Sequence, residues 1–104
     1  MLPPHFTVQF TAKARKDIRA IAEYIAIDSP SNAEDFVLWM EEEIMSLDRF
    51  PLRCPVALES ESWGLEVRLL LVGSYRVLFT IRGVAVIVLR VRHGARKSST
   101  SFDD

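Results

Sequence analysis

The chain has 104 residues, of which 49% are hydrophobic and 26% charged, and its formal net charge is −1. This composition excludes a disordered chain, because enough apolar surface is present to offset the entropy of ordering. The apolar runs 69–75 and 84–89 are far shorter than the roughly 20 residues that cross a bilayer, and the N-terminal residues lack the pattern of a signal peptide. We therefore expect one cytoplasmic domain over residues 1–104, with a polar tail at 97–104.

The residues that bind metals or cofactors are few and scattered. Cys54 is the one cysteine, which excludes an internal disulfide and a thiolate metal cluster from this chain alone. His5 and His93 are far apart, and no carboxylate cluster of suitable spacing accompanies them. The four glycines stand singly and form no phosphate-cradling loop. We expect no metal and no cofactor, and we expect Cys54 to be a small buried residue instead of a nucleophile.

Charge is distributed unevenly between the two parts of the chain. Residues 1–61 carry 6 Lys and Arg against 11 Asp and Glu, a balance of −5. Residues 62–104 carry 7 against 3, a balance of +4. The basic part favours an anionic partner, although arginines that merely cover a solvated sheet face are the alternative. We expect no DNA binding by this chain alone, because phosphates repel its acidic part.

The first part of the chain predicts one strand and two helices. Residues 6–10 alternate apolar and polar side chains, which is typical of a short strand. Thr11 is a plausible N-cap for a helix that ends at Asp28. The pair 29–30, Ser-Pro, predicts a new N-cap and first helical position, and this second helix should end near Phe50. A connection this short predicts an antiparallel helical hairpin with a shared core.

The second part predicts a sheet. After an irregular connector at 51–63, apolar runs at 65–72, 75–81 and 84–91 are separated by two short glycine-containing turns. They predict a three-stranded antiparallel meander, with one face on the helices and the other presenting arginines. In the second run, alternation places Tyr75, Val77, Phe79 and Ile81 on one face, and in the third it places Ile87, Leu89 and Val91 opposite Val88, Arg90 and Arg92. The fold class is α+β.

Several motifs in this order resemble a known family. They are the Tyr-Ile and Ser-Pro pairs at the helix junction, Leu-Asp-Arg-Phe-Pro at 47–51, Val-Gly-Ser-Tyr-Arg-Val at 72–77 and Val-Arg-His-Gly-Ala-Arg at 91–96. Over residues 6–96 the chain resembles the RelE/ParE superfamily, the toxins of bacterial type II toxin–antitoxin systems. The resemblance implies an N-terminal strand, an antiparallel two-helix hairpin and a three-stranded antiparallel meander. It also implies a heteromeric complex with a cognate antitoxin, which lays a helix and an extended segment across the toxin.

Three large apolar side chains lie off the main stripes of the predicted helices. They are Tyr24, Leu38 and Trp39. We expect them to form part of an exposed apolar groove for the antitoxin. The alternative is that they extend the core.

The superfamily has two branches with different targets. RelE-like members cut mRNA on the ribosome by 2′-OH attack on a phosphate, which requires cations and a proton-transferring group. In that branch the catalytic residues here would be Arg68, Arg76, His93 and Arg96. ParE-like members act on DNA gyrase, and the target-binding residues here would be Arg90, Arg92 and Arg96.

The ParE-like branch is favoured by the ending Val-x-His-Gly-x-Arg and by Phe102, which lacks the hydroxyl of the terminal tyrosine expected of a nuclease. Structural roles remain open for the same residues. Arg68 and Arg76 could pair with Glu59, Glu61 or Glu66, and His93 could make a hydrogen bond at a strand end. A degenerate member that only binds its antitoxin is a third reading.

Overall fold

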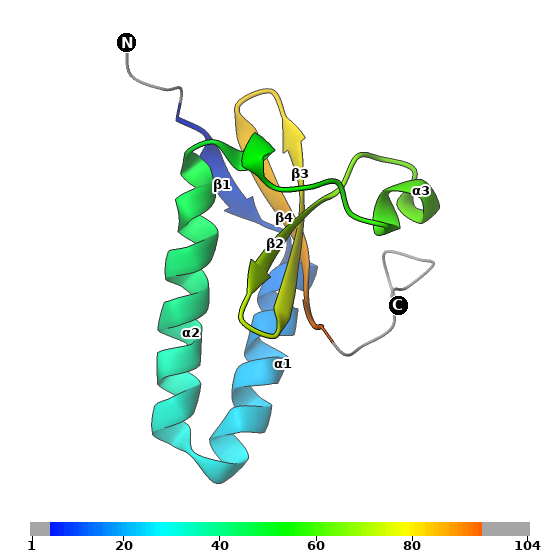
Figure 1. Ribbon diagram of the computed structural model, residues 1–104. Coiled ribbons are helices and arrows are strands. Elements are labelled where there is room, and N and C mark those ends of the chain that lie inside the picture. The colour runs from blue at the N-terminus through cyan, green and yellow to red at the C-terminus, as the bar shows by residue number, and fades with distance from the viewer. Residues whose placement is uncertain (1–4, 95–104) are drawn as a thin grey trace.

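The computed structural model describes residues 5–94, and Figure 1 shows the arrangement of its elements. It confirms the α+β fold. The helices are α1 (Ala12–Asp28), α2 (Pro30–Met45) and the short α3 (Glu59–Trp63), with 3-10 turns η1 (Ser46–Asp48) and η2 (Pro51–Arg53) between the last two. The strands are β1 (Thr7–Phe10), β2 (Arg68–Val72), β3 (Tyr75–Arg82) and β4 (Ala85–His93). None of the helices within residues 5–94 combines the length and the apolar composition needed to cross a bilayer.

The N-terminal strand completes the sheet. The strand order is β1-β4-β3-β2, so β1 lies beside the last strand of the chain. β1 pairs with β4 in parallel, with Thr7 opposite Ala85 and Phe10 opposite Val88, whereas the meander β2-β3-β4 is antiparallel as predicted. Placing the first strand in parallel requires a long crossover, and the helical hairpin supplies it.

The predicted helix caps are confirmed at both starts. The Thr11 hydroxyl accepts a hydrogen bond from the Ala14 amide and donates one to the Leu89 carbonyl of β4. Ser29 accepts from the Asn32 amide, and Pro30 occupies the first position of α2. Each cap satisfies an amide that has no partner inside its helix. Because Ser29 caps α2 directly after α1 ends at Asp28, a single residue separates the two helices.

The end of the second helix is an error of the sequence prediction. α2 ends at Met45, five residues before Phe50, and η1 follows. The Ser46 hydroxyl donates to the Glu43 carbonyl and tightens the last turn. Pro51 disfavours the helical conformation of the residue before it, and Phe50 adopts a left-handed φ of 49°. The connector 51–63 is also more regular than predicted, because it contains η2 and α3.

A β-bulge changes the predicted faces of β4. Leu78 pairs with Arg90 but Phe79 pairs with Val88, so Leu89 is an extra residue on β4. The predicted grouping of Ile87, Leu89 and Val91 is therefore wrong, because Val88 and Val91 both join the core beneath the helices while Ile87 and Leu89 pack on the opposite face. On β3, which carries no extra residue, the predicted grouping is confirmed: Tyr75, Val77, Phe79 and Ile81 face the helices.

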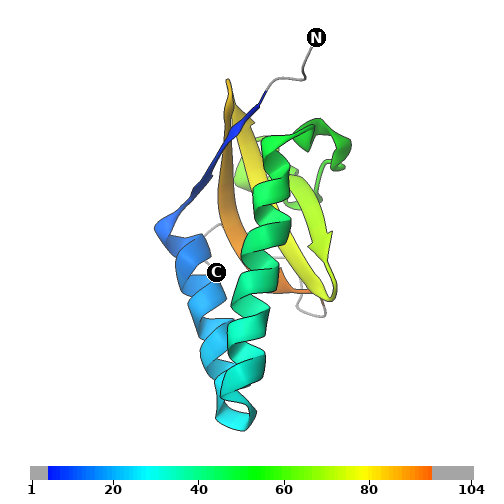
Figure 2. The ribbon, with the colours of Figure 1, turned by 90° about the vertical axis from the view of Figure 1, so that its left-hand side faces the viewer.

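The sheet is covered on both faces. α1 and α2 lie side by side across one face, as Figure 2 shows, and their tip extends beyond the sheet in Figure 1. The main core between these layers includes Met40, Ile44 and Phe79, all fully buried. On the other face α3 and the connector cover a smaller cluster around Val67 and Leu78.

Removing the hydroxyl of Thr11 should weaken the junction of β1, α1 and β4. Thr11→Val loses both the helix cap and the bond to the Leu89 carbonyl, so we expect a loss of about 1–2 kcal/mol in the free energy of unfolding. Urea denaturation measures this loss. Ser62→Ala is the control, because Ser62 is exposed in α3, and it should change stability by less than about 0.5 kcal/mol. Equal stability of the Thr11 variant and the wild type would contradict the assigned role.

Candidate functional site

An ion pair on the α3 face of the sheet holds the predicted catalytic residue Arg76. Its guanidinium donates from Nη1 to Glu59 Oε2 at 2.6 Å and from Nη2 to Glu59 Oε1 at 2.9 Å. Glu59 is 1% exposed and lies at the start of α3. The bond to Glu59 raises the pKa of Arg76 above its already high ordinary value, so the arginine keeps its charge at every physiological pH. The pair therefore joins α3 to β3 and neutralises a cation.

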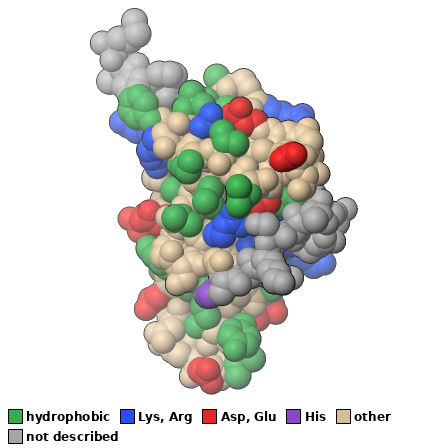
Figure 3. Space-filling view, turned by 45° about the vertical axis from the view of Figure 1, so that its right-hand side comes forward, with side chains coloured by type: hydrophobic (Ala, Val, Ile, Leu, Met, Phe, Trp, Pro, Cys, Tyr) green, Lys and Arg blue, Asp and Glu red, His purple; other side chains and the backbone are tan. Residues whose placement is uncertain are grey.

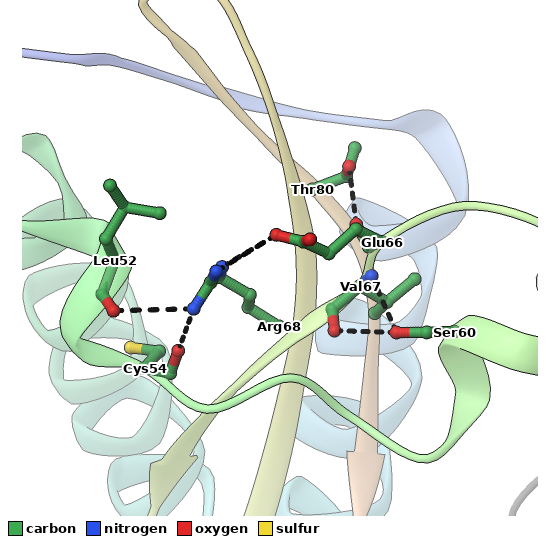
Figure 4. Close-up of polar contacts among 7 residues, drawn as sticks. All are labelled: Leu52, Cys54, Ser60, Glu66, Val67, Arg68 and Thr80. Carbon is green, nitrogen blue, oxygen red and sulfur yellow. Dashed lines mark hydrogen bonds and ion pairs between the residues drawn. The ribbon is translucent and has the colours of Figure 1, made fainter.

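Arg68 is committed in a similar way at the sheet edge (Figure 4). Its Nε and Nη2 donate to Oε1 of Glu66 at 3.2 and 3.0 Å, and its Nη1 donates to the Cys54 carbonyl at 2.6 Å. The Ser60 hydroxyl binds both backbone groups of Val67, which fixes α3 to the start of β2. Arg68 thus pairs with Glu66, and Arg76 pairs with Glu59. Both pairs agree with the structural alternative that the sequence left open for these arginines.

The predicted target-binding residues Arg90 and Arg92 lie largely inside the protein. Arg90 is 8% exposed, and its Nε and Nη2 donate to the Asp17 carboxylate at 2.8 and 3.0 Å. Asp17 also accepts from the Val91 amide at 2.9 Å, which fixes α1 to the edge of β4. Arg92 is 3% exposed, with its guanidinium 5.9 Å from the centre of the Trp63 ring. The expectation that this face presents arginines to solvent is therefore wrong for these two side chains.

The remaining predicted catalytic residues lie at the end of the sheet. His93 is exposed as the last residue of β4, and its ring meets the Tyr75 ring edge-on at 5.3 Å. Arg96 and Phe102 lie outside the described residues. Within residues 5–94 no three His, Cys, Asp or Glu side chains come together in a group that could hold a metal ion. Cys54 is buried, and burial raises the pKa of its thiol more than the nearby Arg53 and Arg68 lower it, which disfavours the thiolate.

A groove runs between α1 and α2 on the surface of the hairpin. Near the sheet it is a cavity of about 500 Å³, and toward the tip it continues into one of about 640 Å³. The two cavities share Arg19, Ala22 and Val37, so they form one continuous groove. Its apolar lining comes from Phe10, Ile18, Ala22, Ala26, Pro30, Ala33, Val37, Leu38 and Met45, and its charged lining from Arg15, Arg19, Glu23, Glu34 and Glu41.

The three predicted antitoxin-binding residues do not meet in this groove. Leu38 lines it. Tyr24 is 76% exposed but lies two residues from Ala22, about 200° around α1 and thus on the opposite flank. Trp39 packs on the β2–β3 turn, where a Cβ on Gly73 would lie 2.6 Å from its ring, so this turn requires glycine.

The sequence prediction missed the other groove residues, although a signal was present. Arg15, Arg19 and Glu23 recur every four residues and so follow one flank of α1. Ala22 and Ala26 have the same spacing, which leaves a shallow lane of small side chains beside that flank.

The fold and these surfaces can be compared with known proteins. Residues 8–98 match the model of a family described as the ParE toxin of the type II toxin–antitoxin system parDE. The chain belongs to this family. A chain of the chromosomal ParDE toxin–antitoxin system from P. aeruginosa is similar in fold, with a TM-score of 0.70, 24% identity and coverage of 86% of this chain and 96% of that one.

A second solved structure is similar in fold and from the related branch. It is the toxin–antitoxin complex RelBE2 from Mycobacterium tuberculosis, with a TM-score of 0.59, 28% identity and coverage of 86% of this chain and 98% of that one. No protein of curated function matches this sequence. Membership of the ParE family and of the wider RelE/ParE superfamily thus agrees with the resemblance drawn from the motifs.

Truncating Arg76 in this ParE toxin should cost stability. Arg76→Ala removes both hydrogen bonds that a buried carboxylate receives from it, so we expect a loss of about 3 kcal/mol or more in the free energy of unfolding. The double variant Glu59→Leu/Arg76→Met replaces the pair by apolar groups and should recover much of that loss. Urea denaturation of both variants provides the measurement. Arg82→Ala, at an exposed strand end, is the control, and an equal effect of Arg76→Ala and Arg82→Ala would contradict the structural role.

Proposed function

We propose that this ParE toxin arrests growth by binding DNA gyrase and that a cognate antitoxin neutralises it in a heteromeric complex. Membership of the ParE family supports the target. The two similar solved structures come from a ParDE toxin–antitoxin system and from a RelBE2 toxin–antitoxin complex, which supports the partner.

The observation that carries the choice of target is the ion pair of Arg76 with Glu59. A ribonuclease of the RelE type needs cations that face the phosphate in its transition state. In this toxin the carboxylate of Glu59 holds the Arg76 fork, and Glu66 with two connector carbonyls occupies the fork of Arg68. The charge of Arg76 is thus paired with Glu59 on the face that α3 covers, and that of Arg68 is paired with Glu66 at the edge of the sheet. This arrangement favours a protein-binding toxin over mRNA cleavage on the ribosome.

The groove between α1 and α2 is the surface that we assign to a helix of the antitoxin. A groove lined by apolar side chains from two parallel ridges suits the apolar stripe of a third helix. Leu38, on its wall, remains 65% exposed in the free toxin, and Ile18 forms part of its floor. Covering this surface would bury apolar area that the isolated toxin leaves in water.

The edge of β2 is the surface that we assign to an extended segment of the same antitoxin. The Leu69 amide points away from β3 and donates a hydrogen bond to the Pro55 carbonyl. Because backbone groups alternate along a strand, the amide and carbonyl of Leu71, two residues on, also point away from β3. Within residues 5–94 no strand pairs with that outer side at Leu71. Figure 3 shows hydrophobic side chains gathered on this side of the molecule, and the exposed ones in the connector and β2 are Leu52, Val56, Leu58 and Leu71.

Purified toxin should inhibit gyrase in a supercoiling assay and should leave ribosome-bound mRNA intact. The same preparation is tested in both reactions, with toxin pre-mixed with antitoxin as the control that restores supercoiling. Normal supercoiling at concentrations that stop growth would contradict the gyrase assignment. The RelE-like alternative would instead be supported by two results together. The toxin would cleave mRNA at the decoding site, and a stably folded Glu59→Leu/Arg76→Met variant would lose this cleavage.

A charge placed on the groove wall should release the toxin from its antitoxin. Leu38→Glu puts a carboxylate where an apolar helix face would pack, so we expect at least a tenfold loss of antitoxin affinity and growth arrest despite co-expressed antitoxin. Val84→Glu is the matched control, because Val84 is equally exposed at 66% but lies at the β3–β4 turn. Calorimetry with the purified antitoxin measures the change. Equal affinities of the two variants would contradict the groove assignment.

A further inference from the structure

The charged rims of the α1–α2 groove differ along its length. Near the sheet, Arg15 and Arg19 stand on the α1 rim while Glu41 stands on the α2 rim. Toward the tip, Glu23 on α1 and Glu34 on α2 make both rims acidic. All five side chains are exposed, so each is available to a partner lying in the groove.

These charges have few partners inside the toxin. Among the described residues no ion pair involves any of the five, and the Arg15 guanidinium lies over the Phe10 ring, 5.0 Å from its centre. Arg15 also lies at the end of the first turn of α1, where the helix dipole disfavours cations. The toxin itself therefore gains little from these charges, in contrast to Arg76 and Arg90, which are bound by carboxylates.

The apolar floor of the groove is also graded. At the tip end it includes the small side chains Ala26 and Ala33, whereas at the sheet end it includes the larger Ile18 and Met45, and Ala22 and Val37 are common to both ends. Large apolar side chains of an incoming helix therefore fit over the alanines, and smaller ones fit beside Ile18. Charge and shape thus change together from one end of the groove to the other.

We infer that the groove selects one charge register of the antitoxin helix, with acidic side chains against Arg15 and Arg19 and basic side chains at the hairpin tip against Glu23 and Glu34. This inference rests on the assignment of the groove to the antitoxin. Complementary charges at the rim of an interface exclude wrong partners and set the register more than they add affinity. The rim charges are thus the specificity determinants of this toxin, while Ala22, Val37 and Leu38 supply the apolar contact.

The test uses the full-length toxin and its purified antitoxin in calorimetry at low and high salt. Arg19→Glu should weaken binding about tenfold at low salt and less at high salt, because the contribution is electrostatic. Arg82→Glu makes the same charge change away from the groove and should bind within twofold of the wild type. Reversing the acidic residues of the antitoxin helix to lysine, one at a time, should identify one change that restores binding to the Arg19→Glu toxin.

The tip is tested in the same way with Glu34→Lys. Its control is Glu43→Lys, an exposed residue of the same helix that lies nine positions away and therefore about 180° around it. Suppose that Arg19→Glu and Glu34→Lys bind the antitoxin within twofold of the wild type at low salt, while Leu38→Glu still weakens binding. This result would overturn the charge register and leave the groove assignment intact. If Leu38→Glu also binds normally, the groove assignment itself fails. Thermal unfolding of each variant verifies that the exposed substitutions leave the toxin folded.

Discussion

The buried ion pair between Glu59 and Arg76 determines how this toxin uses the two faces of its sheet. It ties α3 to β3 on the face opposite the helical hairpin, and the bonds of Arg68 to the Leu52 and Cys54 carbonyls hold the connector at the edge of β2. A covered and neutralised face leaves two other surfaces for partners, the groove between α1 and α2 and the outer edge of β2. Because removing one member of a buried pair is costly, this arrangement depends on both side chains.

A second carboxylate, that of Asp17, ties the helix α1 to the sheet as Glu59 ties α3. Asp17 binds both the Arg90 guanidinium and the Val91 amide of β4, just past the point where β1 ends at Phe10 opposite Val88. It thus fixes α1 to the part of the strand edge that β1 leaves unpaired. The hairpin is held at its sheet end, and its tip projects beyond the sheet, where Glu23 and Glu34 line the groove.

Three carboxylates explain why three arginines of the basic C-terminal part do not form a basic surface. Arg68, Arg76 and Arg90 each bond to an acidic side chain. Arg15 and Arg19, by contrast, are exposed cations on α1, in the acidic part of the sequence. The charge recognition that we propose therefore depends on a few side chains along one groove, and the net charge of a segment says little about it.

The α+β order, the helix starts at Thr11 and Ser29 and the antiparallel meander could be predicted from the sequence, because caps, turns and periodicity are local. Only the tertiary structure decided the rest. The bulge at Leu89 placed Val88 and Val91 on the same face, since one extra residue shifts the alternation of a strand. Pairing across 17 and 73 positions, Glu59 with Arg76 and Asp17 with Arg90, decided which arginines are exposed. Helix geometry likewise separated Tyr24 from the groove that Leu38 lines, because such distances and angles depend on how distant segments pack.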